Sequence, residues 1–195
     1  RGWAHFHAVS YRILFSEPAE SIRLFKAGKE DNLSVPEAFT STDDLKIHFR
    51  FPASDKPLLV KVALSPVDTD GAVKNMEAEL PGWDFDATVN QSQQVWNKAL
   101  NGIAMESADT KVMKNFYTAL YHSMIAPFAY QDTDGRYLGM DKQVHHAEAG
   151  YTNYSVFSLW DTFRALHPLM TIINPQLAAD WGTVMVQGYK EGGIL

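Results

Sequence analysis

A tryptophan and an aspartate stand side by side at Trp160 and Asp161, where a strand-like apolar stretch gives way to helical spacing. A carboxylate held at such a junction can accept hydrogen bonds from sugar hydroxyls, and an indole ring offers an apolar face to a sugar ring. Further aromatic residues accompany the pair along the sequence: Tyr151, Tyr154, Phe157 and Phe163. Aromatic faces beside a hydrogen-bonding carboxylate indicate a carbohydrate-binding cleft.

The same residues also fit a structural role. Residues 158–161 read Ser-Leu-Trp-Asp, a capping-box pattern in which Ser158 caps a helix and Asp161 lies near its positive end. This pattern is common before apolar runs, so the capping role and the sugar-binding role both stay open at this point. Arg164 follows Asp161 by three residues, a spacing at which two helical side chains can form an ion pair.

Residues 132–135 read Asp-Thr-Asp-Gly and resemble the start of a calcium-binding loop. An EF-hand loop has its glycine at the sixth position and an acid at the twelfth. Here the glycine is fourth, at Gly135, and the twelfth residue is Gln143. The sequence therefore favours an Asp-Gly turn between short strands.

Two histidine patterns also favour structural over chemical roles. His145, His146 and Glu148 suggest a zinc site, but adjacent residues point in different directions and no third spaced histidine follows, which favours a solvated loop. His122 and Ser123 do not form a nucleophile–base pair on one helix, because neighbouring helical side chains diverge by about 100°. We expect His122 to be buried and hydrogen-bonded.

The composition excludes several classes of protein. With 195 residues, 46% of them hydrophobic, the chain is long enough to bury a core in one domain or two. A net charge of −6 gives no basic footprint for nucleic acid. No apolar run approaches the roughly 18 residues of a membrane span. The absence of cysteine excludes disulfides and thiolate metal sites and leaves the compartment open.

Two kinds of periodicity divide the chain near Pro66. Before it, alternating apolar residues such as Ile22 and Leu24 predict strands separated by turn-rich spacers. After it, helical spacing dominates, and helices are expected at residues 162–173 and 176–189 with a break at Asn174-Pro175. Pro168 should kink the first of these helices or start it late. We therefore expect a β-rich region up to about residue 66 and a mainly helical region after about residue 72.

Several longer segments resemble the family 92 glycoside hydrolases, which are calcium-dependent, exo-acting α-mannosidases. The segment around the Trp-Asp pair, residues 154–169, is the most informative of them. The others are residues 115–123, similar to the family's first catalytic-domain helix, 132–137, similar to the following hairpin, 83–86 with 96–100, similar to an inter-domain linker, and 11–18, similar to a strand. The resemblance extends along nearly the whole chain and is specific in its second half.

The resemblance implies an α+β architecture in three parts. Residues 1–66 would form the C-terminal part of a β-sandwich, and residues 67–106 a helical linker. Residues 107–195 would form the first helices of an (α/α)6 catalytic barrel. The chain would then be an internal fragment of a larger enzyme, with a tendency to self-associate through truncated domain surfaces.

The resemblance also implies roles for individual residues in an inverting α-mannosidase. Asp161 would accept hydrogen bonds from the terminal mannose of a glycan, Trp160 would support that carboxylate or contact the sugar, and Arg164 would pair with Asp161. The catalytic acid, the catalytic base and the calcium ligands would lie outside this chain, so the isolated chain would be inactive. A periplasmic or secreted location is implied by the family.

Two alternatives belong to other classes. The first is a non-catalytic carbohydrate-binding or structural module that keeps the fold without the chemistry. The second is a different hydrolase or a phosphorylase with the same sandwich-plus-barrel plan, because a fold alone does not fix a reaction.

Overall fold

The computed structural model describes residues 9–31, 45–148 and 150–193. The strands of the first part are β1 (Ser10–Phe15), β2 (Ser21–Lys26), β3 (Lys29–Asp31), β4 (Leu45–Arg50) and β5 (Val60–Ser65). The helices are α1 (Thr69–Glu79), α2 (Phe85–Leu100), α3 (Thr110–Ser123), α4 (Leu159–Thr162), α5 (Leu166–Ile173) and α6 (Pro175–Gly192). Between α3 and α4 lie four short strands: β6 (Phe128–Ala129), β7 (Arg136–Leu138), β8 (Val144–His146) and β9 (Tyr154–Ser155).

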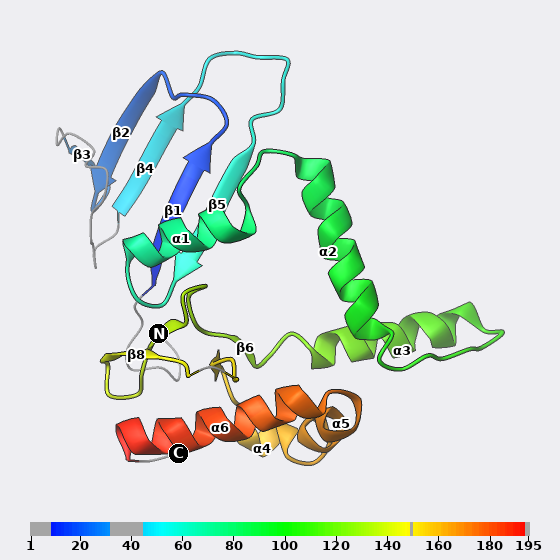
Figure 1. Cartoon of the computed structure of the whole chain (residues 1–195). Helices are drawn as coiled ribbons and strands as arrows, with labels where there is room; N and C mark the ends of the chain where they lie inside the picture. Colours follow the sequence, from blue (N-terminus) through cyan, green and yellow to red (C-terminus); the bar gives the residue numbers. More distant parts are fainter. Residues whose placement is uncertain (1–8, 32–44, 149, 194–195) are drawn as a thin grey trace.

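The predicted change of secondary structure near Pro66 is confirmed, because β5 ends at Ser65 and α1 begins at Thr69. Residues 1–8 and 32–44 of the expected β-rich region lie outside the described residues. The chain forms a mixture of sheets and helices (Figure 1). Among the described helices, none combines the length and the hydropathy that a membrane crossing needs.

The strands of the first part form two antiparallel sheets. β1 pairs with β5, placing Ile13 opposite Val62, and β2 pairs with both β3 and β4. Aromatic contacts join the two sheets, because the ring centroid of Phe15 lies 4.8 Å from that of Phe49 and 5.0 Å from that of Phe51.

The β1–β5 sheet has one covered face and one apolar, exposed face. Helix α1 lies across the sheet (Figure 1), and its residues Ala72 and Met76 are buried. Successive strand residues point to opposite faces. On the second face, the apolar side chains remain between 38% and 58% exposed: Tyr11, Ile13, Val60, Val62 and Leu64. No other described element covers this face. Its apolar side chains are of the kind expected in the interior of a sandwich.

Helix α2 has no fully buried side chain, and most of its residues are exposed. All 16 of its residues are described, and none is buried. The side chain of Asp84 caps its start by accepting a hydrogen bond from the backbone N–H of Ala87 at 2.9 Å. The helix ends at Asn101, which has φ −71° and is therefore not in the left-handed conformation. Instead, the N–H of Gly102 donates to the carbonyl of Ala99, the tight bond of a 3₁₀ turn.

Helix α3 packs against the far end of α2 through aromatic rings. The centroids of Trp96 and Tyr121 lie 4.6 Å apart in an edge-to-face arrangement. Asp109 caps α3 by accepting from the N–H of Lys111 at 2.8 Å. His122 is exposed on this helix, so the expectation of a buried histidine is wrong. The helix ends one turn before Pro127, leaving His122 on its solvent side.

The helix expected at residues 162–173 is divided in two. The short α4 ends at Thr162, residues 163–165 form a turn, and α5 begins at Leu166. Pro168 occupies the first turn of α5, where its missing N–H costs no helical hydrogen bond, so the predicted late start is confirmed. The predicted break before α6 is confirmed too. Asn174 caps α6 by accepting from the N–H of Leu177.

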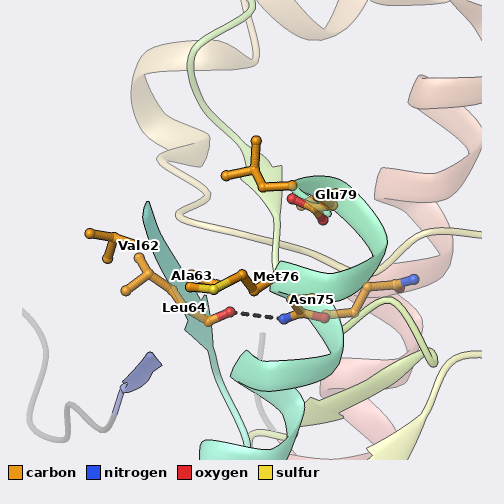
Figure 2. A pocket seen from close by; sticks show the side chains of 9 residues that line it. Val62, Ala63, Leu64, Asn75, Met76 and Glu79 are labelled. Carbon is orange, nitrogen blue, oxygen red and sulfur yellow. Dashed lines mark hydrogen bonds between the residues drawn. The ribbon is translucent and has the colours of Figure 1, made fainter. Parts of the chain in front are cut away.

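A buried polar cluster joins the sheet region to the later part of the chain. The carboxylate of Asp132 has no exposed surface and accepts hydrogen bonds from Ser65 Oγ at 2.9 Å and Asn75 Nδ2 at 2.8 Å. Asn75 also donates to the carbonyl of Leu64, at the edge of a cavity of about 330 Å³ between β5 and α1 (Figure 2). The predicted Asp-Gly turn follows Asp132 directly, with Gly135 at φ +85°. In the segment that resembles a calcium loop, the first aspartate is therefore buried in a hydrogen-bonded cluster.

Candidate functional site

The Trp160–Asp161 pair lies on α4, at the surface of the molecule. Trp160 is 81% exposed. Tryptophan is usually mostly buried, so an indole this exposed is an unusual feature of a folded surface. Asp161 is exposed beside it, and its backbone N–H donates to the carbonyl of Ser158 at 3.0 Å. The structure thus presents the aromatic face and the carboxylate together to solvent.

The capping-box interpretation is wrong in its main element. Ser158 occupies the N-cap position, but its side chain makes no capping hydrogen bond to a backbone N–H. Instead, Ser158 Oγ donates to Asp161 Oδ2 at 2.5 Å. The serine therefore orients the carboxylate. The other oxygen, Asp161 Oδ1, accepts no hydrogen bond from the described residues. An oriented carboxylate with a spare oxygen can accept a hydrogen bond from a ligand hydroxyl.

The expected ion pair between Arg164 and Asp161 does not form. The α4 helix ends at Thr162, which takes Arg164 off the helical spacing that the pair requires. The guanidinium lies over the ring of Phe163 instead, with Cζ 5.3 Å from the ring centroid. Arg164 is exposed and follows Asp161 by three residues in the sequence. Its guanidinium lies over Phe163 and not beside the Asp161 carboxylate.

The aromatic residues around the pair divide into two groups. Trp181 of α6 is 2% exposed, and three rings pack edge-on against it. The centroids of Tyr154, Phe157 and His167 lie 6.4, 6.3 and 5.1 Å from that of Trp181. These rings pack around a buried tryptophan, whereas Phe163 is 52% exposed. The prediction that all these aromatic residues surround a sugar-binding cleft is therefore wrong for Tyr154 and Phe157, which pack against Trp181.

Trp181 contacts the segments on both sides of α4. Tyr154 and Phe157 precede α4 in the sequence and His167 follows it, and the rings of all three pack against Trp181 of α6. A cavity of about 380 Å³ lies beside Trp181, lined mainly by apolar side chains from α2, α5, α6 and the segment that follows α3. Neither this cavity nor the one beside α1 is lined by Trp160, Asp161 or Arg164. In this chain the pair therefore lies on an open surface.

A second group of side chains was missed by the sequence reading. Asp141, His145 and Glu191 place donor atoms within 4.8 Å of one another. The sequence predicts a solvated loop that contains His145, His146 and Glu148, whereas in the structure His145 and His146 belong to strand β8. A strand turns adjacent side chains to opposite faces, so the two histidines do separate as expected. The Asp141–His145 spacing of four residues was visible, but Glu191 comes from a distant helix.

This group does not fit a calcium ion. Calcium takes six to eight oxygen ligands, and the group offers two carboxylates and one imidazole nitrogen. Within the described part of the chain, no other group of three such side chains converges in this way.

Comparisons with known proteins agree on one family. A family model described as the glycosyl hydrolase family 92 catalytic domain matches residues 71–195. A GH92 alpha-mannosidase from Bacteroides thetaiotaomicron matches with 34% identity and a TM-score of 0.83, over 94% of this chain and 25% of that chain. The same enzyme in complex with mannoimidazole matches with a TM-score of 0.82.

Two further relatives extend the comparison. A GH92 inverting mannosidase from Bacteroides thetaiotaomicron shares the fold at 22% identity, with a TM-score of 0.80 over 94% of this chain and 25% of that chain. A protein of Arthroderma benhamiae described as an uncharacterized secreted glycosidase is 35% identical over 74 residues, which are 36% of this chain and 10% of that protein. The chain thus spans about a quarter or less of the length of these relatives. Because the family model covers more than half of the sequence, the chain belongs to glycosyl hydrolase family 92.

Proposed function

We propose that this chain is part of an α-mannosidase that removes terminal α-linked mannose from glycans by inverting hydrolysis. The observation that carries the proposal is the exposed Trp160–Asp161 pair, an indole face beside an oriented carboxylate. The family match and the 34% identity to an alpha-mannosidase support the same substrate class.

Asp161 has the principal role in this proposal. Its carboxylate, oriented by Ser158, accepts hydrogen bonds from hydroxyls of the terminal mannose. Trp160 offers its exposed ring to the apolar face of the sugar. Arg164 contributes at the margin of the site, as a cation held over Phe163 and not as the partner of Asp161.

The hydrolytic step itself needs two more carboxyl groups. Inversion requires a general acid for the leaving oxygen and a general base for water, about 6.5–9.5 Å apart. We place both outside this chain, which leaves it with a binding role and no turnover when it is isolated. We likewise place the calcium of the intact enzyme on residues outside this chain.

The architecture proposed for the intact protein has three parts. Residues 1–66 belong to a β-sandwich, residues 67–106 to a helical linker and residues 107–195 to the start of an (α/α)6 barrel. The apolar face of the β1–β5 sheet supports the first assignment, and the absence of any buried side chain on α2 supports the second. A periplasmic or secreted location is part of the proposal, and the description of the relative from Arthroderma benhamiae as secreted supports the latter.

The decisive experiment compares Asp161→Asn with wild type in the intact protein that carries this chain. Loss of a charged acceptor facing a neutral sugar costs about 1.5–3 kcal/mol, so kcat/KM on an aryl α-mannoside should fall by about one to two orders of magnitude or more. The thermal midpoint should change little, because the Asp161 side chain is exposed.

A variant that unfolds at a lower temperature yet hydrolyses normally would make Asp161 a structural residue. An intact protein with no mannosidase activity that still binds mannose would favour the non-catalytic carbohydrate-binding module. Turnover by the highly purified isolated chain, with or without calcium, would contradict the placement of the acid and base.

A further inference from the structure

Asp141, His145 and Glu191 converge from two elements that are far apart in the sequence. Asp141 lies in the loop between β7 and β8, His145 lies on β8, and Glu191 lies in the last turn of α6. All three donor atoms fall within 4.8 Å of one another. His145 Nε2 lies 3.0 Å from Asp141 Oδ1 and 3.1 Å from Oδ2. An imidazole and two carboxylates are therefore gathered at one point, between a hairpin and a helix end.

Both carboxylates are oriented by donors that do not belong to the group. Tyr137 Oη donates to Glu191 Oε1 at 2.6 Å, and the backbone N–H of Met140 donates to Oε2 at 3.2 Å. The N–H of Gln143 donates to Asp141 Oδ1 at 2.9 Å and is the main cause that lowers the pKa of Asp141. Carboxylates that ligate metals are held in this way by outer hydrogen bonds.

The backbone beneath the group has no room for a side chain. A Cβ added to Gly139 would lie 2.5 Å from His145 Cδ2, 2.7 Å from Glu191 Oε2 and 2.9 Å from Asp141 Oδ1. The three side chains thus meet directly above one glycine. This close approach brings the hairpin and the end of α6 together around the three donor atoms.

We propose that Asp141, His145 and Glu191 bind a divalent ion of the zinc class, which joins the β7–β8 hairpin to the end of α6. Imidazole together with carboxylate suits Zn²⁺, and three protein ligands leave a fourth position for water. Zinc–ligand bonds of about 2.0–2.2 Å at tetrahedral angles place two ligands of one ion about 3.3–3.6 Å apart. A donor pair at the 4.8 Å limit of the group would therefore have to close by about 1.2–1.5 Å when the ion binds. His145 binds through Nε2 as neutral imidazole, with its proton on Nδ1.

The test uses the intact protein that carries this chain, with calcium present in excess so that oxygen-rich sites are filled. Zn²⁺ is titrated by calorimetry, and the zinc retained after desalting is measured by elemental analysis. The variants are His145→Ala and Glu191→Gln, the second of which keeps the shape of the side chain and an oxygen for Tyr137. His146→Ala is the matched control, because it is the neighbouring residue on β8 and lies outside the group.

Wild type and the His146→Ala control should bind one more zinc ion per chain than the two ligand variants, whose zinc affinity should fall at least tenfold. Co²⁺ in place of zinc should give the visible absorption bands of a four-coordinate ion in wild type and not in Glu191→Gln. Equal zinc binding by wild type and Glu191→Gln, with folding verified by circular dichroism, would overturn the proposal. So would an equal loss in the His146→Ala control. Mannosidase activity does not enter this test, so its outcome is separate from the function proposed above.

Discussion

Arg136 donates two hydrogen bonds to the carboxylate of Asp68, with Nη1 2.8 Å from Oδ2 and Nη2 3.2 Å from Oδ1. Asp68 is also the N-cap of α1, where its Oδ1 accepts from the N–H of Gly71 at 2.6 Å. The Nε of the same arginine lies 3.0 Å from Asp134 Oδ2, and Lys74 lies 2.9 Å from that oxygen. One guanidinium therefore links the start of α1 to the turn before β7.

Acid should weaken this link. The hydrogen bond from Lys74, with help from Arg136, lowers the pKa of Asp134 from 3.8 to about 2, and Arg136 lowers the pKa of Asp68. Because both folded-state values lie below the unfolded value, the stabilisation is fully present above about pH 4 and is lost as the pH falls towards 2. Urea unfolding of wild type and Asp134→Asn between pH 6 and about 2 measures this. The variant should lose about 0.2–1 kcal/mol less stability across the acid range, since these are surface pairs. Parallel curves would show that Asp134 contributes nothing.

Two glycine-to-alanine changes in helices should have opposite effects on stability. A Cβ at Gly71 would lie 2.2 Å from Asp132 Oδ2 and 2.5 Å from Ser65 Oγ, so Gly71→Ala should destabilise by about 1–3 kcal/mol. At Gly182 of α6 nothing lies within 4 Å of the added Cβ, so Gly182→Ala should stabilise by about 0.5–1 kcal/mol. Denaturant unfolding of both variants decides the matter. A stabilising Gly71→Ala would mean that the buried cluster around Asp132 rearranges freely.

Alanine in place of two tryptophans should separate binding from packing. Trp181 is 2% exposed and packs against three rings, so Trp181→Ala should cost about 3–5 kcal/mol of stability. Trp160 is 81% exposed, so Trp160→Ala should change stability by less than about 0.5 kcal/mol while lowering kcat/KM of the intact protein about tenfold. Thermal unfolding and steady-state kinetics on the same preparations test this. Normal kinetics in Trp160→Ala would remove the indole from the proposed site.

The isolated chain should self-associate through the apolar face of the β1–β5 sheet. Val62 lies in the middle of that face and is 50% exposed, so Val62→Lys should place a charge there and shift the chain towards the monomer. Val112→Lys, on α3 and 43% exposed, is the control and should leave the association unchanged. Light scattering over a concentration series gives the result. A monodisperse wild-type monomer at every concentration would contradict the prediction.

Local patterns in the sequence predicted the elements but not their contacts. The alternation at Ile22 and Leu24 and the break at Asn174-Pro175 depend on neighbouring residues, and the structure confirms both. The capping role of Ser158 also seemed local, yet it failed because the serine donates to Asp161 and not to the helix backbone. A hydroxyl can accept a hydrogen bond from the helix backbone or donate one to a neighbouring side chain, and the local sequence allows both.

Sequence patterns did not predict the contacts between segments that are far apart in the chain. Asp132 looked like part of a turn motif, and nothing near it in the chain indicates that Ser65 and Asn75 bury its carboxylate. Glu191 likewise reaches Tyr137 and Met140 only through the docking of α6 on the hairpin. The sugar-binding roles of Trp160, Asp161 and Arg164, and the proposed domain boundaries, stay predictions that the experiments above address.

The exposed helix α2 has a geometric consequence, because the chain forms a closed circuit. It leaves α1, runs along α2 and α3, and returns to α1 where Asp132 meets Asn75 and Arg136 meets Asp68 (Figure 1). The 16 residues of α2 form a rod about 24 Å long, and each inserted residue would rotate everything beyond it by about 100°. A heptad inserted into α2 would restore the angle to within about 20° but would still lengthen one side of the circuit by about 10 Å. Although none of its side chains is fully buried, α2 is therefore a spacer whose length and helical phase are both fixed by the point at which the chain returns.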